Sequence, residues 1–283
     1  MVARVWRRHD LNPSAWRAWR ELKGYDVVIV KDMLALTPAL VCWFQERNCL
    51  FLDCFQQVHQ WQLPLQRTVA GLADRLMVFS KYQSELWTRK LDSRRVQMIP
   101  FGIDARFFQV KERRGQPDLF MCVGTDKRKD YRLFAEAAAR TPLRSVVVTS
   151  SRRVADEVRG HGLELLRNVT YPELRTLYGR SIVVVPVLPD TDYPTGLTTL
   201  LEALASGALV IAARTPILEE YVSKEDGVLF YEPGDEIDLV ERMRYAAACW
   251  QHYDPEVGPA LVRTRYSSER MDEAIAEVIE AIK

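Results

Sequence analysis

Residues 190–213 include residue types that could bind an anion and hold a ligand carrying hydroxyl groups. They follow a short apolar run, residues 181–188, which is typical of a buried parallel strand. A polar turn with Gly196 then opens a predicted helix over 198–206 that carries Glu202 on its first turn, and an apolar strand ends the unit. Because the first turn of a helix has unpaired N–H groups and a positive dipole end, it attracts anions. This stretch therefore favours a phosphate-binding site.

A second chemical signal is the basic loop over residues 125–131, which follows a predicted strand over 119–124. The loop contains Lys127, Arg128 and Lys129. Open α/β sheets bind ligands at the carboxyl ends of their strands, so these cations are placed to neutralise a bound diphosphate. The alternative interpretation is a basic turn that only faces solvent.

These segments resemble the retaining glycosyltransferases of family four, which have the GT-B fold. The resemblance rests on EALASG at 202–207, ADRLMVFS at 73–80 and VQMIPFGID at 96–104, and it is strongest over 73–245. It implies two Rossmann-like α/β domains, the N-terminal one shortened. It further implies transfer of a sugar, with retained anomeric configuration, from a nucleotide diphosphate to a sugar, lipid or other small acceptor. No cofactor and no metal are expected.

The resemblance also implies roles for individual residues. Lys129 and Arg128 would neutralise the leaving diphosphate, and Glu202 would accept hydrogen bonds from the ribose hydroxyls. Asp53 and His59 would lie on the acceptor side, although a lone histidine such as His59 is often structural. The residues expected to bind the donor are Gly124, Thr125, Lys129, Val169, Thr195, Gly196, Leu197, Thr198 and Glu202.

Three features depart from the family pattern and keep alternatives open. Pro194 stands where the family has its first glutamate, Thr125 stands where an arginine is usual, and no Gly-rich loop precedes residue 26. A non-catalytic GT-B-like subunit that binds a nucleotide sugar or scaffolds a complex is therefore the alternative function. Glu202 also has its own alternative, because Thr199 and Glu202 have the spacing of a capping box.

Composition excludes several other classes. The formal net charge of +1 gives no reason to expect a nucleic-acid partner. Asp190 and Asp192 could contact a metal, but two carboxylates seldom suffice for a site. The five cysteines include no Cys-x-x-Cys pair, which favours buried thiols of a cytoplasmic protein. No apolar run approaches the ~18 residues of a membrane span, and no signal peptide is predicted.

The N-terminal segment is the one candidate for membrane contact. Residues 1–24 are rich in Arg and Trp, and a helix is predicted over 14–23. A basic helix bearing Trp can lie on an anionic membrane surface, so peripheral contact at the inner face is a hypothesis. The alternative is a helix that packs its Trp side on the domain while its Arg side chains face solvent.

The remaining pattern alternates strands with helices, which indicates parallel sheets covered on both faces. Strands are predicted over 26–31, 49–53, 75–80, 96–100, 119–124, 145–150, 181–188, 208–213 and 227–234. Further helices are predicted over 34–45, 65–73, 80–90, 131–140, 172–179, 235–250 and 268–282. Ser80 and Asp235 are the predicted N-caps of two of these helices. The predicted division is an N-terminal domain over 1–104, a linker over 105–117, a nucleotide-sugar-binding domain over 118–252, and C-terminal helices over 253–283 that cross back to the first domain.

Overall fold

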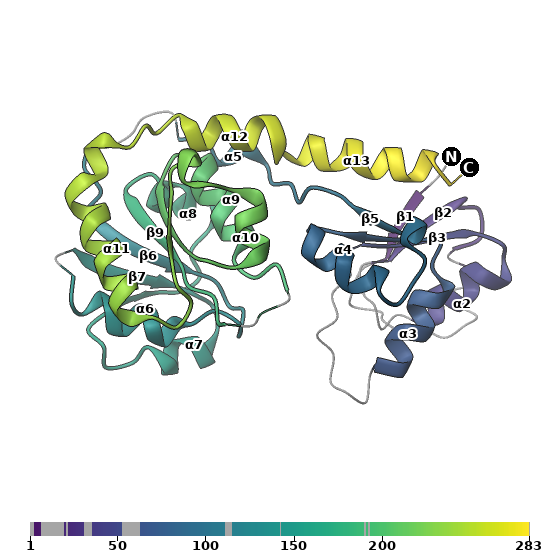
Figure 1. Ribbon diagram of the computed structural model, residues 1–283, viewed down its shortest axis with the longest axis horizontal. Helices are drawn as coiled ribbons and strands as arrows, with labels where there is room; N and C mark the ends of the chain where they lie inside the picture. The colour runs from purple at the N-terminus through teal and green to yellow at the C-terminus, as the bar shows by residue number, and fades with distance from the viewer. Residues whose placement is uncertain are drawn as a thin grey trace. The chain divides into compact units, whose positions relative to one another are not determined.

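The computed structural model of the protein describes residues 3–6, 20, 22–30, 36–52, 63–110, 115–141, 143–189, 191 and 193–282. The chain divides into two compact units (Figure 1). The first comprises Met1–Pro100 and Met271–Lys283, and the second comprises Phe101–Arg270. Each unit contains one β-sheet whose strands are parallel. The predicted α/β fold class is therefore confirmed.

The sheet of the first unit has the order β1-β2-β3-β4-β5. Its strands are β1 (Ala3–Trp6), β2 (Val27–Val30), β3 (Asn48–Leu52), β4 (Arg75–Val78) and β5 (Val96–Met98). Its helices are α2 (Leu36–Phe44), α3 (Leu63–Leu72), α4 (Lys81–Thr88) and the short η3 (Ser93–Arg95). Ser80 caps α4 as predicted, because its hydroxyl accepts a hydrogen bond from the Gln83 N–H at 3.0 Å. Phe51 and Trp87 lie in the core of this unit.

Strand β1 was not among the predicted elements. It pairs in parallel with β2, with Arg4 opposite Val28. The sequence of β1 is ARVW, so a charged residue interrupts its apolar character. A strand of four residues without a continuous apolar run gives little signal in a sequence. The sheet of the first unit therefore begins before the first strand that the sequence indicated.

The sheet of the second unit has the order β11-β10-β9-β6-β7-β8. Its strands are β6 (Leu119–Val123), β7 (Arg144–Val148), β8 (Glu164–Leu166), β9 (Ser181–Val185), β10 (Leu209–Ala213) and β11 (Val228–Tyr231). From β6 the chain adds β7 and then β8 on one side of the sheet. It then returns to the other side of β6 and adds β9, β10 and β11 in turn. This is the doubly wound order, and its reversal lies between β6 and β9.

Helices cover both faces of this sheet (Figure 1). On one face lie α6 (Tyr131–Ala138), α7 (Arg152–Glu157) and α11 (Glu236–Cys249), and α6 packs against both α7 and α11. On the other face lie α5 (Ala105–Phe108), α8 (Tyr171–Tyr178), α9 (Leu197–Ala205) and α12 (Val257–Arg265), of which α9 contacts the other three. The remaining elements are α10 (Pro216–Tyr221), η4 (Lys224–Asp226), η5 (Trp250–His252) and α13 (Ser268–Glu280).

The central strands are buried along their whole length. Every residue of β6, β9 and β10 is buried, because helices cover the sheet on both faces. Such strands have continuous apolar sequences in place of alternating ones. This explains why the apolar runs at 119–124, 181–188 and 208–213 predicted these three strands.

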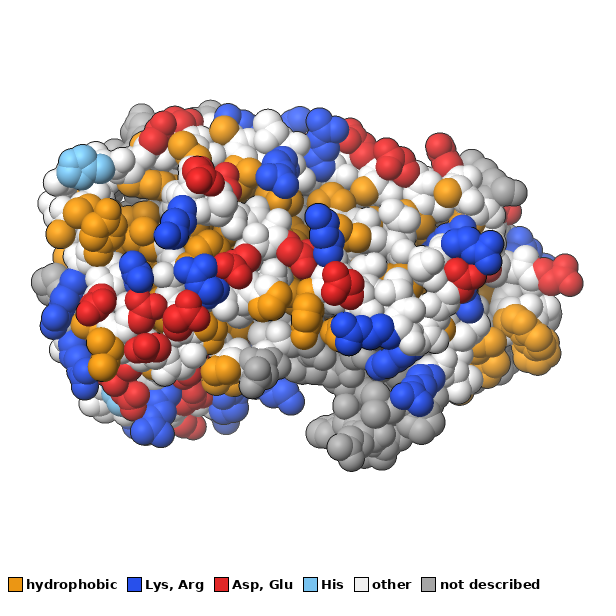
Figure 2. Space-filling model, in the orientation of Figure 1, with side chains coloured by type: hydrophobic (Ala, Val, Ile, Leu, Met, Phe, Trp, Pro, Cys, Tyr) orange, Lys and Arg blue, Asp and Glu red, His pale blue; other side chains and the backbone are white. Residues whose placement is uncertain are grey.

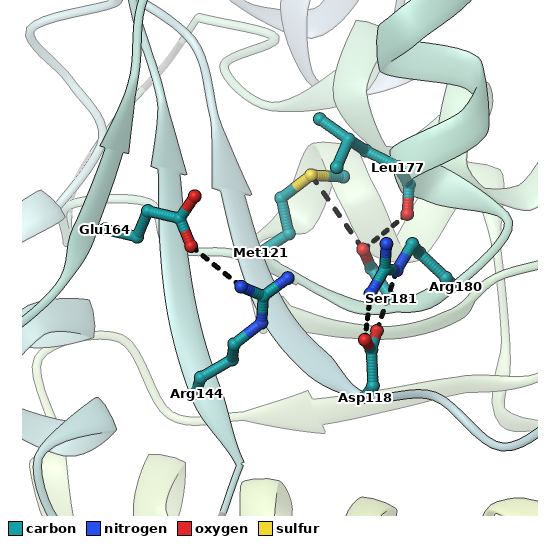
Figure 3. A network of polar contacts seen from close by, with 7 residues as sticks. All are labelled: Asp118, Met121, Arg144, Glu164, Leu177, Arg180 and Ser181. Atoms are coloured by element: carbon teal, nitrogen blue, oxygen red, sulfur yellow. Dashed lines mark hydrogen bonds and ion pairs between the residues drawn. The ribbon is translucent and has the colours of Figure 1, made fainter.

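A polar network aligns β6 and β9 at their amino ends (Figure 3). Arg180 forms two hydrogen bonds with Asp118, and these two residues directly precede the paired Leu119 and Ser181. The Ser181 hydroxyl also donates to the Leu177 carbonyl at 2.5 Å. Because the ion pair is partly exposed, its contribution to stability is small, about 0–1 kcal/mol. The ion pair lies where the two strands begin, next to the pairing of Leu119 with Ser181.

The segment predicted as a linker, 105–117, begins with helix α5. The Asp104 carboxylate caps this helix by accepting a hydrogen bond from the Phe107 N–H at 2.9 Å. Ala105 and Phe108 are buried in the core of the second unit. The charged residues that follow suggested an irregular segment, but these two apolar side chains attach its first part to the second unit.

Helix α12 packs closely on α9, and Gly258 permits the contact. A Cβ added at Gly258 would lie 2.7 Å from the Leu204 carbonyl oxygen and 3.2 Å from its Cα. Gly258→Ala is therefore expected to lower the free energy of unfolding by about 1–3 kcal/mol, the cost of overpacking a core. Denaturant titration measures this change. Gly71→Ala, on α3 where an added Cβ meets nothing, should instead be neutral or stabilise by up to about 1 kcal/mol.

Candidate functional site

The candidate site lies at the reversal of strand order in the second unit. Loop 124–130 leaves the carboxyl end of β6, and loop 186–196 leaves the carboxyl end of the adjacent β9. The Leu188 N–H donates to the Arg128 carbonyl at 2.9 Å, which joins the two loops. Doubly wound sheets bind ligands at this position, outside the carboxyl ends of the strands.

Lys129 is the buried cation of the site, with 4% of its surface exposed. Its ammonium donates to the Val123 carbonyl at 2.5 Å and to the Thr199 hydroxyl at 2.8 Å. An ammonium has three N–H donors, so one remains for a ligand. Burial lowers the pKa of Lys129, while Cys122, Asp126 and Glu202 act in the opposite direction. The two predicted segments therefore meet through one side chain.

Gly124 lies directly beside this ammonium. Its φ is +134°, and an added Cβ would lie 3.2 Å from the Lys129 Nζ and 3.2 Å from the Tyr131 hydroxyl. Glycine is therefore needed at position 124, because it adopts this positive φ without strain. It also has no Cβ that would crowd the Lys129 ammonium and the Tyr131 hydroxyl. The Tyr131 hydroxyl is buried and has no hydrogen-bond partner among the residues that the structure describes. Thr125, the next residue of the loop, is exposed.

Asp126 ties the basic loop to the turn before α9, a role that the sequence reasoning missed. Its carboxylate accepts hydrogen bonds from the Thr195 hydroxyl at 3.1 Å and from the Arg128 N–H at 3.0 Å. The Arg128 guanidinium lies 4.6 Å from the centre of the Tyr193 ring. An aspartate side chain commonly accepts from the backbone N–H two residues on, but nothing in the sequence indicates Thr195 as a second partner.

The first turn of α9 begins at a glycine that no other residue replaces easily. Gly196 is the N-cap, with φ of +83°, and an added Cβ would lie 2.4 Å from the Val185 Cγ1. The Thr195 N–H donates to the Tyr193 carbonyl at 2.6 Å, and the Leu197 N–H donates to the Pro194 carbonyl at 3.3 Å. Of the four predicted donor-binding residues here, Gly196 and Thr198 are therefore the candidate N–H donors to a ligand.

Glu202 lies on the second turn of α9, not on its first turn as predicted. Because Leu197 is the first helical residue, Thr199 is the third and Glu202 the sixth. The capping-box interpretation is therefore wrong: a capping box needs Thr199 as N-cap, and its hydroxyl instead accepts from Lys129. The predicted start at 198 missed this because Gly196 adopts a left-handed conformation, which opens the helix one residue earlier.

The Glu202 carboxyl group is buried, with 8% of the residue exposed. Its Oε2 accepts a hydrogen bond from the Tyr178 hydroxyl at 2.9 Å. Burial raises the pKa of Glu202 to about 7, against the opposing effects of the Tyr178 hydroxyl and the Lys129 charge. A group with this pKa exchanges its proton near neutral pH. Perturbed carboxyl groups of this kind are typical of functional sites.

Val169, the residue predicted near the nucleobase, lies directly before α8. It is half-buried and packs against the core of the second unit. Thr170 then caps α8 in a capping box with Glu173. Helix α8 ends at Tyr178, the residue that contacts Glu202, so one helix links Val169 to the carboxyl group.

Several predicted residues lie outside the described part of the chain. These are Asp53, His59, Asp190, Asp192, Cys54 and most of the N-terminal segment. Within the described ranges, no group of three or more His, Cys, Asp or Glu could hold a metal ion. In those same ranges, no helix is long and apolar enough to cross a membrane. On the face drawn in Figure 2, basic and acidic side chains are interspersed.

Comparison with known proteins extends this description. Residues 117–248, which include both loops, match the model of the family Glycosyl transferases group 1. No curated protein sequence matches the chain.

Three solved structures are similar to most of the chain. Sucrose-phosphate synthase from Thermosynechococcus elongatus is 18% identical, with a TM-score of 0.77 over 94% of this chain and 76% of its own. HepE from Anabaena, in complex with UDP and glucose, is 14% identical, with a TM-score of 0.81 over 96% and 82%. A glycosyltransferase from Rickettsia africae is 15% identical, with a TM-score of 0.79 over 98% and 84%. The chain shares the fold of these proteins, and the predicted GT-B architecture is confirmed.

Proposed function

We propose that the protein is a glycosyltransferase that moves a sugar from a uridine diphosphate donor to an acceptor hydroxyl, with retained anomeric configuration. The bond between the anomeric carbon and the diphosphate oxygen breaks. A bond to the acceptor oxygen forms on the same face of the sugar, and the acceptor proton passes to the leaving diphosphate. The family match over residues 117–248 and the UDP complexes of HepE support this proposal.

The hydrogen bond between Lys129 and Thr199 carries the proposal. It places a buried cation against the first turn of α9, where helix N–H groups also attract anions. Negative charge grows on the diphosphate as it leaves, and preorganised positive groups stabilise such charge most effectively in a site shielded from water. Lys129 and the amides of Gly196 and Thr198 would hold the diphosphate, with Arg128 at the edge of the site.

The other residues have supporting roles in this proposal. The second oxygen of Glu202 would accept hydrogen bonds from the ribose hydroxyls, and the segment at Val169 would face the base. Gly124, Thr125, Thr195 and Leu197 would shape the loops around the diphosphate. Asp53 and His59 would serve the acceptor, a sugar, lipid or other small molecule. In this proposal Lys129 and the amides of α9 stabilise the diphosphate charge, so we expect the reaction to need neither a metal nor a cofactor.

Turnover of the donor tests the function directly. The purified protein is incubated with UDP-glucose, and with the guanosine and adenosine diphosphate sugars as controls, in the presence of a panel of acceptors. Release of UDP is measured together with the anomeric configuration of the product. We expect release only from a uridine donor, and a product of inverted configuration would contradict the retaining mechanism.

The alternative is a subunit that binds a nucleotide sugar without transferring it. Pro194 favours this alternative, because it supplies no carboxylate where the resembling family has its first glutamate, and its carbonyl is held within the turn by the Leu197 N–H. Calorimetry separates the two functions. Tight binding of UDP-glucose without turnover on any acceptor would favour the binding subunit.

Lys129→Met is expected to weaken UDP binding about 10- to 150-fold. The substitution keeps the buried stem and removes the charged hydrogen-bond donor, which is worth about 1.5–3 kcal/mol. Lys127→Met is the matched control, because Lys127 is exposed on the same loop and the change in net charge is equal. Equal losses in the two variants, measured by calorimetry, would show that only the overall charge of the loop matters.

A further inference from the structure

Tyr178 holds one oxygen of Glu202 from the neighbouring helix. It is the last residue of α8, its exposed fraction is 0%, and its hydroxyl donates to the Glu202 Oε2 at 2.9 Å. The ring meets the Phe108 ring edge-on, with 6.1 Å between centroids. Packing therefore leaves the tyrosine little rotational freedom. Neither the family resemblance nor the matching family description assigns it a role.

The hydrogen bond from Tyr178 gives the two carboxylate oxygens of Glu202 different roles. A carboxylate can accept about four hydrogen bonds, two at each oxygen. Tyr178 occupies one acceptor position of Oε2, so we expect Oε1 to be the oxygen that accepts from a ligand. A buried carboxylate with no such donor would be poorly oriented and costly to ionise.

We propose that Tyr178 is a positioning residue that fixes the orientation and the ionised state of Glu202 for the ribose of the nucleotide donor. This inference rests on the proposed function, because it takes Glu202 as the acceptor of the ribose hydroxyls. It adds a residue that never touches the donor and acts only through Glu202.

The groups that surround Glu202 explain why Tyr178 can influence its pKa. The groups that act on Glu202 are the Tyr178 hydroxyl and Lys129, both of which lower its pKa against the larger effect of burial. Tyr178 itself has a pKa well above its usual value, mainly through burial and then through Glu202, with smaller effects from Cys122 on β6 and Tyr171 on α8. It therefore remains a donor at all relevant pH values.

The other charged groups on the helices that pack against α9 face elsewhere. They are Arg106 on α5, Glu173 and Arg175 on α8, and Arg263 and Arg265 on α12. Arg175 donates to the Phe107 carbonyl, and Arg106 pairs with Glu269. Removing the Tyr178 hydroxyl should therefore raise the pKa of Glu202 with no compensating group, and leave more of it protonated at neutral pH.

Tyr178→Phe tests this, because it removes the hydroxyl and keeps the ring packing. UDP-glucose is the probe, since its diphosphate has no proton that titrates near neutral pH, and its affinity is measured by calorimetry between about pH 6 and 9. The affinities of the wild type and the variant are compared at each pH, because the lowered pKa of Lys129 affects both proteins alike. Ionisation of Glu202 should raise the affinity, and in the variant this rise should move to higher pH. A pKa raised by about one should cost about fivefold in affinity at about pH 7 and up to about tenfold at about pH 6, with recovery towards about pH 9.

Two controls separate positioning from packing. Tyr171→Phe, on an exposed residue of the same helix, should leave the pH profile unchanged. In the Glu202→Gln background, Tyr178→Phe should cause no loss that depends on pH, because residue 202 can no longer ionise. A loss that is equal at every pH in the wild-type background, or a pH-dependent loss in the Glu202→Gln background, would overturn the proposal.

A second readout distinguishes failure of this inference from failure of the proposed function. Carboxyl-carbon NMR, with the Glu202 signal assigned by its loss in Glu202→Gln, gives the pKa of this group without any nucleotide. A raised pKa in Tyr178→Phe together with absent UDP-glucose binding by the wild type would overturn the proposed function and the ribose role that depends on it. Normal binding with an unchanged pKa would overturn the role of Tyr178 alone.

Discussion

Glu202→Gln is expected to weaken UDP-glucose binding about 10- to 150-fold near pH 8 while the protein becomes more stable at the same pH. The loss of affinity follows from the charge of the acceptor. Hydrogen bonds to an ionised group are worth about 1.5–3 kcal/mol, and glutamine keeps the shape but not the charge. Glutamine can still accept the hydrogen bond of Tyr178 through its amide oxygen, so the local packing is retained.

The gain in stability follows from the raised pKa of Glu202. The pKa is about 7 in the folded protein, against an ordinary value of 4.5. A carboxyl group with a raised folded pKa stabilises the fold fully below its unfolded pKa, and this contribution is lost as pH rises through the folded pKa. The window of loss therefore runs from about 4.5 to about 7, and its size is up to about 3 kcal/mol at about 1.4 kcal/mol for each unit.

Denaturant unfolding of both proteins at several pH values measures this effect. The wild type should lose stability relative to Glu202→Gln as the pH rises through this window, and the two should be nearly equal at about pH 4. Glu241→Gln is the control, because Glu241 is exposed on α11 and should show neither effect. A Glu202→Gln variant that binds donor normally, or that is less stable near pH 8, would contradict the proposed role of Glu202.

The cost of Glu202 in stability is itself an argument for a functional role. A carboxyl group that costs stability when ionised is a poor structural element, and residues that trade stability for a chemical task are typical of functional sites. The hydrogen bond from Tyr178 and the nearby charge of Lys129 reduce that cost without removing it. The geometry therefore favours function over helix capping at Glu202, in agreement with its position on the second turn.

The sequence predicted those parts of the fold that depend on local patterns. Strands β6, β9 and β10 are buried on both faces, so their apolar runs were unambiguous. Ser80 and Asp235 were recognised as helix caps because a cap depends on residues three positions apart. Strand β1 and helix α5 were missed because each is four residues long, which is too short for a hydrophobic period to be recognised.

The contacts that build the candidate site were beyond such patterns. The sequence indicated Lys129 and Glu202 separately, through a loop after a strand and through a family resemblance. It did not indicate that Thr199 accepts from Lys129, that Asp126 accepts from Thr195, or that Tyr178 donates to Glu202. The two residues of each pair are far apart in the sequence and are brought together by the order of strands in the sheet. No local spacing in the sequence encodes that order.

Gly196→Ala is expected to lower the free energy of unfolding by about 2–5 kcal/mol, because two costs add. The φ of +83° is a left-handed conformation that costs an alanine about 1–2 kcal/mol. The new Cβ would lie 2.4 Å from the Val185 Cγ1, and Val185 is fully buried in β9, so relieving this contact costs about 1–3 kcal/mol more. Denaturant unfolding measures the sum.

Val185→Ala separates the two costs, because it removes the methyl group that the new Cβ would meet. Val185→Ala alone should destabilise the fold by leaving a cavity, but in the double variant the same space receives the Cβ that Gly196→Ala introduces. The double variant should therefore be more stable than the sum of the single changes predicts, by about 1–2 kcal/mol. The cost of the left-handed conformation at residue 196 should remain in the double variant. Its affinity for UDP should also stay weaker than that of the wild type, because the first turn of α9 starts from residue 196. Simple additivity of the two substitutions would show that the clash does not control the position of the helix.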